Sequence, residues 1–129
     1  MERTRDELVA HLRALGVAPG QVLLVHASFR ALRPVARGPR TVLEALHEAL
    51  GPAGTLALPA WTGDDDAPFD PRTTPASTDL GVLADTFWRM PGVRRSDHPF
   101  AIAALGPLFL HAPSEGCEEC DAARASVGR

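Results

Sequence analysis

A strand–helix–strand pattern in the first half of the chain constrains its fold more than any other sequence feature. The continuous apolar run at residues 22–25 follows a Pro-Gly turn and has the length of a strand buried on both faces of a parallel sheet. Gly38 and Pro39 suit the N-cap and the first position of a helix, which Gly51-Pro52 ends. A second short run at residues 55–58 completes a βαβ unit, whose crossover should be right-handed.

Further elements are expected on both sides of this unit. A capping box that begins at Thr4 predicts a first helix over about residues 5–15, and Ser77 or Thr78 caps a third helix. An apolar run at residues 100–105 predicts a third strand. The remaining stretches are expected to be loops or connectors: residues 29–37, 60–78 and 93–99.

The chain has 129 residues, which suits one domain. Residues 1–107 predict an α/β fold with helices flanking a mostly parallel sheet. Residues 108–129 have no sustained hydrophobic periodicity and predict an irregular tail. The net charge is −3, and the basic residues are scattered arginines, so a nucleic-acid partner has no support. No apolar run approaches the roughly 20 residues of a membrane span. The charged N-terminus lacks the apolar segment of a signal peptide, and we expect a cytoplasmic protein without a membrane partner.

The tail carries both cysteines of the chain, Cys117 and Cys120. They could form half of a zinc site with His111 as a third ligand, but a second pair at a suitable spacing is missing. The alternative, which the sequence favours, is a pair of free cysteines, so no bound metal is expected.

Three positions could carry chemistry, because the ligands of an open α/β sheet bind beyond the carboxyl ends of its strands. The first is His26-Ala27-Ser28-Phe29, whose backbone N–H groups and hydroxyl could hold an anionic or amide ligand. The helix start at Gly38-Pro39 would favour a phosphate nearby. In the alternative interpretation, Ser28 satisfies the turn backbone and His26 is half-buried and hydrogen-bonded. A dinucleotide or NTP fingerprint is absent from the sequence.

The second position is the Trp-Thr-Gly-Asp-Asp-Asp segment at residues 61–66. Its three adjacent carboxylates could steer a polycationic substrate, or they could form a solvated loop tip. Trp61 could form a flat wall against a sugar ring, or it could pack into the protein. The spacing of the acids does not match a calcium-binding loop.

The third position is Arg-Arg-Ser-Asp-His-Pro at residues 94–99. Adjacent residues do not normally face one another, so Ser96, Asp97 and His98 are not expected to form a local catalytic triad. The segment is either a binding loop that lines the cleft or a tight turn, in which Pro99 forces His98 toward extended backbone.

Several short motifs follow one another in a specific order between residue 4 and Gly106-Pro107. They include Leu15-Gly-Val-Ala-Pro-Gly20, Val22-Leu-Leu-Val-His26-Ala-Ser28-Phe29-Arg30, Gly38-Pro-Arg-Thr-Val-Leu-Glu-Ala-Leu46, Leu58-Pro-Ala-Trp-Thr62, Phe69-Asp-Pro71 and Arg95-Ser-Asp-His-Pro99. In order and spacing this set resembles the aminoglycoside 3-N-acetyltransferases, an antibiotic N-acetyltransferase family distinct from the GNAT fold. The resemblance implies a three-layer α/β/α architecture.

The resemblance also implies a reaction, in which an acetyl group passes from acetyl-CoA to the 3-amino group of a 2-deoxystreptamine antibiotic. The amine would attack the thioester directly with help from a general base. The segment His26-Ala27-Ser28-Phe29 is similar to the family segment that contacts the pantetheine and phosphates of CoA. The residues that the resemblance implies at the antibiotic are Trp61, Thr62, Asp64, Ser96 and His98. The acidic loop suits a substrate that is polycationic at neutral pH.

Members of this family are about twice as long as this chain, and their catalytic histidine lies in the second half, so a truncated chain is expected. His98 and His26 are then the histidines with a position in the cleft. Both are weaker candidates for the general base than the catalytic histidine of the family. Three hypotheses remain open: a short member of the family, a catalytically inactive CoA-binding fragment, and a related acyltransferase that acts on another amine. The antibiotic and the oligomeric state are also open.

Overall fold

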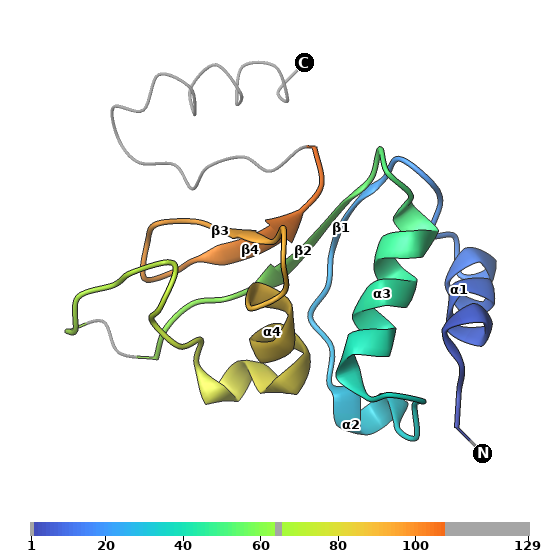
Figure 1. Ribbon diagram of the computed structural model, residues 1–129, viewed down its shortest axis with the longest axis horizontal. Coiled ribbons are helices and arrows are strands. Elements are labelled where there is room, and N and C mark those ends of the chain that lie inside the picture. The colour runs from blue at the N-terminus through green and yellow to red at the C-terminus, as the bar shows by residue number, and fades with distance from the viewer. Residues whose placement is uncertain (1, 64–65, 108–129) are drawn as a thin grey trace.

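The computed structural model describes residues 2–63 and 66–107 as an α/β fold built on a four-stranded mixed sheet (Figure 1). In chain order its elements are α1 (Arg5–Ala14), β1 (Val22–Leu24), α2 (Phe29–Leu32), α3 (Pro39–Leu50), β2 (Thr55–Pro59), the 3-10 turn η1 (Thr78–Leu80), α4 (Gly81–Trp88), β3 (Arg94–Arg95) and β4 (Ile102–Leu105). The predicted tail at residues 108–129, with Cys117 and Cys120, lies outside the described residues, as does Asp64.

The predicted βαβ unit is confirmed. Strands β1 and β2 pair in parallel, with Val22 opposite Thr55, and α3 forms the crossover between them. Gly38 is the N-cap of α3 with φ +76°, and Pro39 occupies its first turn, as expected. The capping box is also present, since the Thr4 hydroxyl accepts a hydrogen bond from the Glu7 N–H at 3.2 Å and starts α1.

The prediction of a mostly parallel sheet is wrong. The strand order is β1-β2-β4-β3, and β4 runs antiparallel to both of its neighbours. After the crossover through α4, the strand that runs in the same direction as β2 is β3. This strand has two residues and no apolar run. Only a short connection separates β3 from β4, so the two form a hairpin, and β4 enters the sheet between β3 and β2. The stretches expected to be loops at residues 29–37 and 93–99 contain α2 and β3.

Strand β1 is not buried on both faces, contrary to the prediction. It lies at one edge of the sheet, and Val22 and Leu24 are 58% and 65% exposed. Leu23, which points to the other face of the strand, packs against the core. The apolar run at residues 22–25 is therefore the sequence of an edge strand with one open face.

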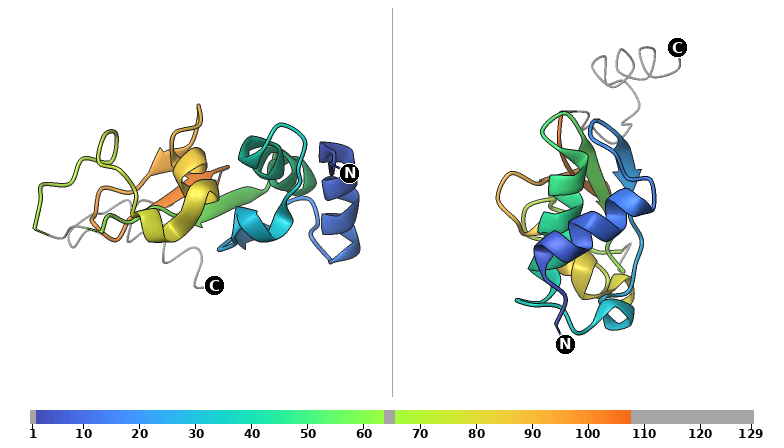
Figure 2. Two further views of the ribbon diagram at one scale, coloured as in Figure 1. Left: turned by 90° about the horizontal axis from the view of Figure 1, so that it is seen from below. Right: turned by 90° about the vertical axis from the view of Figure 1, so that its right-hand side faces the viewer.

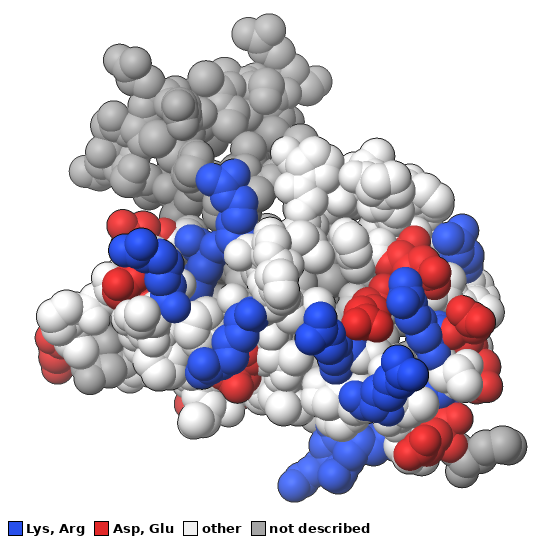
Figure 3. All heavy atoms as spheres, viewed as in Figure 1, with Lys and Arg blue, Asp and Glu red and all other residues white. Residues whose placement is uncertain are grey.

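The core lies between α3, α4 and the central strand β2. Its largest fully buried side chains are Phe87, Leu43, Leu50, Leu56, Leu58 and Leu83. Helix α1 packs on the outer side of α3 (Figure 2), and Arg5 of α1 forms ion pairs with Glu44 and Glu48 of α3 at 3.7 and 3.5 Å. On the face in Figure 3 basic and acidic side chains alternate over these helices. Among the described residues, no helix has the length and apolar character needed to cross a membrane.

Candidate functional site

The three predicted positions lie at one end of the sheet. Because β1 and β2 are parallel, the segments that follow them leave the sheet at the same end. The antiparallel strand β4 begins there, so the Ala60 N–H donates to the Ala101 carbonyl at 2.9 Å and the Thr62 N–H to the Pro99 carbonyl at 3.0 Å. Sheet topology therefore brings His26, Thr62 and Pro99 to the same end, although they are far apart in sequence.

The segment after β1 lines a cavity of about 470 Å³. Its walls are His26, Ala27, Ser28, Phe29 and Arg30 on one side and the segment from Asp79 to Val82 on the other. His26 is exposed, so the interpretation of a half-buried histidine is wrong. Ser28 is the N-cap residue of α2, but its side chain makes no capping hydrogen bond, so its hydroxyl does not serve the turn as the alternative interpretation expected.

The helix start that borders this cavity belongs to α4. Gly81 begins α4 with φ +85°, and the N-cap residue Leu80 provides no side-chain hydrogen bond to the first turn. The Gly81 N–H donates to the Thr78 carbonyl of η1, so the donors of this helix start that favour an anion are the N–H groups after Gly81. We expected this role for the helix that begins at Gly38-Pro39, but those residues do not line the cavity. Tertiary packing has brought a later helix to the end of β1.

One arginine and one aspartate line this cavity, so a positive and a negative side chain face it. Arg30 comes from α2 and Asp79 from η1, and both residues are exposed. Arg30 and the Ser28 hydroxyl give one wall of the cavity donors and positive charge, and the start of α4 lies on the opposite wall. Such a wall suits a phosphate or another anionic group, because charged donors give the stronger hydrogen bonds to phosphate oxygens.

Trp61 and Thr62 follow β2 and do not line this cavity. Trp61 is half-buried and packs against the core, and its carbonyl accepts a hydrogen bond from the Ser77 N–H at 2.8 Å. The exposed part of the indole remains at the surface. Asp66 is exposed, and its two acidic neighbours in the sequence are not described.

Ser96 has a structural role in the hairpin of β3 and β4. It is 5% exposed, its hydroxyl accepts a hydrogen bond from the Ile102 N–H at 2.9 Å, and its N–H donates to the Ile102 carbonyl at 3.0 Å. These bonds fix the turn that carries His98.

His98 is exposed at the tip of this turn. Its Nδ1 accepts a hydrogen bond from the Phe100 N–H at 3.0 Å, and the two rings stack with their centroids 5.7 Å apart. A neutral imidazole has one acceptor nitrogen, so Nε2 carries the proton. His98 could accept a proton from a substrate amine only after its bond to Phe100 has broken. The geometry therefore suits a binding residue better than a general base.

The loop between β2 and η1 contains a local turn at Asp70. The Asp70 Oδ1 accepts a hydrogen bond from the Arg72 N–H at 2.9 Å, and the Asp70 N–H donates to the Thr74 hydroxyl at 2.8 Å. The backbone hydrogen bond from Arg72, and after it the charge of Arg72, hold the pKa of the Asp70 carboxyl below its ordinary 3.8.

The sequence analysis did not single out Arg95 as a site residue. Its guanidinium reaches across the sheet end and donates to backbone carbonyls in the loop that follows β2. Its segment, residues 94–99, was one of the predicted positions, but a half-buried arginine in a two-residue strand leaves no periodic signal that would assign it this role. The described residues also contain no group of three His, Cys, Asp or Glu side chains arranged to hold a metal ion.

Comparison with known proteins bears directly on this site. A family model described as aminoglycoside 3-N-acetyltransferase matches residues 24–112. Aminoglycoside N(3)-acetyltransferase IV of Salmonella sp is 59% identical over 106 residues, which are 82% of this chain and 41% of that protein.

Two complexes of relatives are among the solved structures that match the fold. A mutant of aminoglycoside acetyltransferase AAC(3)-IVa in complex with a gentamicin gives a TM-score of 0.81 at 59% identity, over 83% of this chain and 41% of that one. AAC-IIIb in a binary complex with CoASH gives a TM-score of 0.77 at 34% identity, over 83% of this chain and 47% of that one.

The chain thus spans less than half the length of the relatives that it matches. The family model nevertheless includes β2, β3, β4 and both segments that line the cavity after β1. The resemblance seen in the sequence motifs is confirmed. This chain belongs to the aminoglycoside 3-N-acetyltransferase family.

Proposed function

We propose that this chain provides the CoA site of an enzyme that acetylates the 3-amino group of aminoglycoside antibiotics, which confers resistance to them. One observation carries the proposal. His26, Ala27, Ser28 and Phe29, the residues that the family resemblance assigns to CoA, line one cavity with a cation and the start of α4. A relative with 34% identity and a TM-score of 0.77 has been solved with CoASH, which supports this assignment.

The cavity suits the anionic part of acetyl-CoA. We propose that Arg30 faces its phosphates, while Ala27 and Phe29 contact the less polar pantetheine arm. The Ser28 hydroxyl, which makes no capping hydrogen bond, is free to bond an amide of that arm. Asp79 lies on the same wall as the start of α4, so the phosphates would approach from the side of Arg30.

In the proposed reaction, the nitrogen of the 3-amino group forms a bond to the carbonyl carbon of the thioester, and the C–S bond breaks. The sulfur leaves as the CoA thiolate and is protonated, and the amine loses one proton to a base. His98 is an unfavourable base, because its acceptor nitrogen already bonds the Phe100 N–H. His26 borders the CoA cavity, and the base is otherwise unassigned.

On the antibiotic side, we propose contacts with Trp61, Thr62 and His98, whose segments lie at the same end of the sheet as the CoA cavity, and with Asp64, which the family resemblance implies. The complex of a relative with a gentamicin supports this class of ligand. The acidic loop would attract the ammonium groups of the antibiotic over a short range, since the Debye length is about 8 Å at physiological salt. Ser96 would act through the hairpin that it closes rather than by direct contact.

We further propose that the sheet belongs to a three-layer α/β/α fold, distinct from the GNAT fold, as in the relatives. The TM-score of 0.81 against AAC(3)-IVa supports this. A cytoplasmic location, as the sequence analysis expected, stays a prediction.

A second candidate function is CoA binding without turnover, because the acceptor nitrogen of His98 is occupied in the structure.

The first experiment separates these candidates. Acetyl-CoA and gentamicin are mixed with the purified chain, and released CoA thiol is measured, while calorimetry measures CoA affinity. Turnover in the ordinary range of about 1–10³ s⁻¹ supports the enzyme. CoA binding without thiol release supports the binding function, and failure to bind CoA contradicts both.

A matched pair of variants tests the location of the CoA site. Arg30→Gln removes the cation at the cavity and should weaken CoA binding about 2- to 5-fold, the effect of one exposed charge contact. Arg33→Gln removes an exposed charge from the end of the same short helix and should leave the affinity unchanged. Equal effects would place the CoA phosphates elsewhere.

A further inference from the structure

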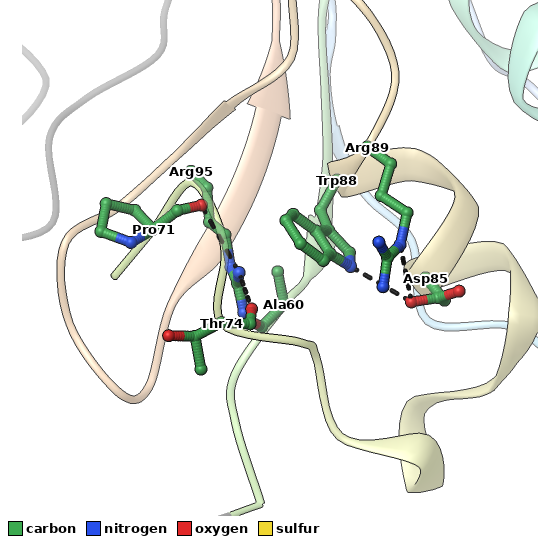
Figure 4. Close-up of polar contacts among 7 residues, drawn as sticks. All are labelled: Ala60, Pro71, Thr74, Asp85, Trp88, Arg89 and Arg95. Atoms are coloured by element: carbon green, nitrogen blue, oxygen red, sulfur yellow. Dashed lines mark hydrogen bonds and ion pairs between the residues drawn. The ribbon is translucent and has the colours of Figure 1, made fainter. Parts of the chain in front are cut away.

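Arg95 connects β3 to the long loop that separates β2 from α4 (Figure 4). Its Nε and one terminal nitrogen donate to the Ala60 carbonyl at 3.0 and 2.6 Å. The other terminal nitrogen donates to the Thr74 carbonyl and, at 3.5 Å, to the Pro71 carbonyl. One guanidinium thus joins the first residue after β2 to the far part of the loop, more than ten residues later in the chain.

Two aromatic rings hold the same guanidinium. Its central carbon lies 4.4 Å from the centroid of the Trp88 ring in α4 and 4.8 Å from the centroid of the Phe69 ring in the loop. Burial, and then the nearby charge of Arg89, lower the pKa of Arg95 from its ordinary value. The guanidinium lies against both rings and donates to backbone carbonyls. The carbonyl dipoles and the faces of the two rings therefore stabilise its positive charge.

The loop of residues 60–77 runs from the end of β2 to η1, and residues 64–65 within it are not described. Its described residues form no helix or strand, although they include Trp61 and Thr62. The Thr62 N–H donates to Pro99, and the Ser77 N–H donates to Trp61, so both bonds lie close to the Arg95 attachment at Ala60. If the guanidinium were lost, partly buried carbonyls would lose their donors and the loop would lose its link to β3.

We propose that Arg95 is a positioning residue, which holds the described parts of this loop, residues 60–63 and 66–77, in the shape that presents Trp61 and Thr62 to the aminoglycoside. This inference rests on the proposed function. Only a planar fork of donors can serve carbonyls in several directions while its faces contact two rings. Lysine, with one compact ammonium group, keeps the charge but cannot reproduce this geometry, so Arg95→Lys is the informative variant.

The test compares Arg95→Lys with Arg94→Lys, a matched change at the exposed neighbouring residue on the same strand. Hydrogen exchange, without any ligand, should be at least about tenfold faster at the Thr62 and Ser77 amides in Arg95→Lys. The Ala60 amide, which bonds the Ala101 carbonyl, should keep its rate, and urea unfolding should show that the variant is folded. Exchange at Thr62 and Ser77 equal to that in Arg94→Lys would overturn the positioning role.

The second readout is ligand affinity, measured by calorimetry with gentamicin and with CoA. We expect Arg95→Lys to weaken gentamicin binding about tenfold and to change CoA binding less than about twofold, because the CoA cavity contains no loop residue. Faster exchange with unchanged gentamicin affinity would overturn the link to recognition. If the wild-type chain binds no gentamicin, the proposed function itself fails, and the exchange result still decides whether Arg95 holds the loop.

Discussion

Replacement of Gly106 by alanine should destabilise the protein strongly. Gly106 follows β4 with φ +144°, and a Cβ there would lie 2.4 Å from the Gly54 carbonyl oxygen and 2.5 Å from the Thr55 hydroxyl. Gly81 offers a matched position, since it also has a positive φ, +85°, but its Cβ would meet no atom within 4 Å. The same substitution at the two glycines therefore separates the cost of backbone conformation from the cost of steric overlap.

The magnitudes follow from this geometry. Gly81→Ala should lower the free energy of unfolding by about 1–3 kcal/mol, because Gly81 has φ +85° and ψ 177°, a region that essentially only glycine adopts. Gly106→Ala carries a similar conformational cost and must also displace the start of β2, which adds about 1–3 kcal/mol of overpacking. The expected loss at Gly106 is therefore about 2–6 kcal/mol, a large part of the roughly 5–15 kcal/mol that stabilises a domain.

Urea unfolding followed by tryptophan fluorescence measures both losses. The account predicts that Gly106→Ala loses at least about 1 kcal/mol more than Gly81→Ala, with the same dependence on urea concentration. Equal losses in the two variants would show that the end of β4 does not approach the start of β2 as closely as described.

Two further predictions concern the core and the loop. Phe87→Ala should cost about 3–5 kcal/mol in thermal or urea unfolding, because Phe87 is fully buried, whereas Val82→Ala on the exposed side of α4 should cost less than about 1 kcal/mol. In an NMR titration the Asp70 carboxyl should have a pKa below 3.8, and its stabilising contribution should persist above that pH and disappear as the pH falls through the lowered pKa. Arg72→Ala keeps the backbone N–H that mainly lowers this pKa, so a return to 3.8 in that variant would contradict the explanation.

The elements that the sequence predicted correctly depend on local chemistry. The Thr4 capping box begins α1, and the Gly38-Pro39 pair begins α3, because caps and prolines act on adjacent residues. The βαβ unit was predictable for the same reason, since its two apolar runs and the intervening helix are consecutive in the chain.

The errors concern which elements become neighbours. Nothing near residues 100–105 indicates that β4 enters the sheet between β2 and β3, because that position depends on a two-residue strand without an apolar pattern. Val22 and Leu24 are exposed because they lie on the same face of β1, which nothing covers among the described residues, while Leu23 on the other face packs against the core. An apolar run predicts a strand but not the number of its covered faces.

In the candidate site too, the features that depend on adjacent residues were predictable and those that depend on tertiary packing were not. The polar segment from His26 to Phe29 was predictable, because it directly follows a strand. The start of α4, which forms the opposite wall of the cavity, was not predictable, because more than fifty residues separate it from β1. Arg95 was missed because its partners, such as Ala60 and Thr74, are backbone carbonyls without a sequence signature.

The central claim, that CoA binds at the carboxyl end of β1, is tested most directly by an NMR titration of CoA into the isotope-labelled chain. A competing basic site exists in a second cavity of about 630 Å³, which is lined in part by Arg72, Arg89, Arg94 and Arg95. The largest saturable shifts should occur at the amides of residues 26–30 and 79–82. Shifts centred on residues 72 and 93–95, or no saturable shifts at all, would contradict it.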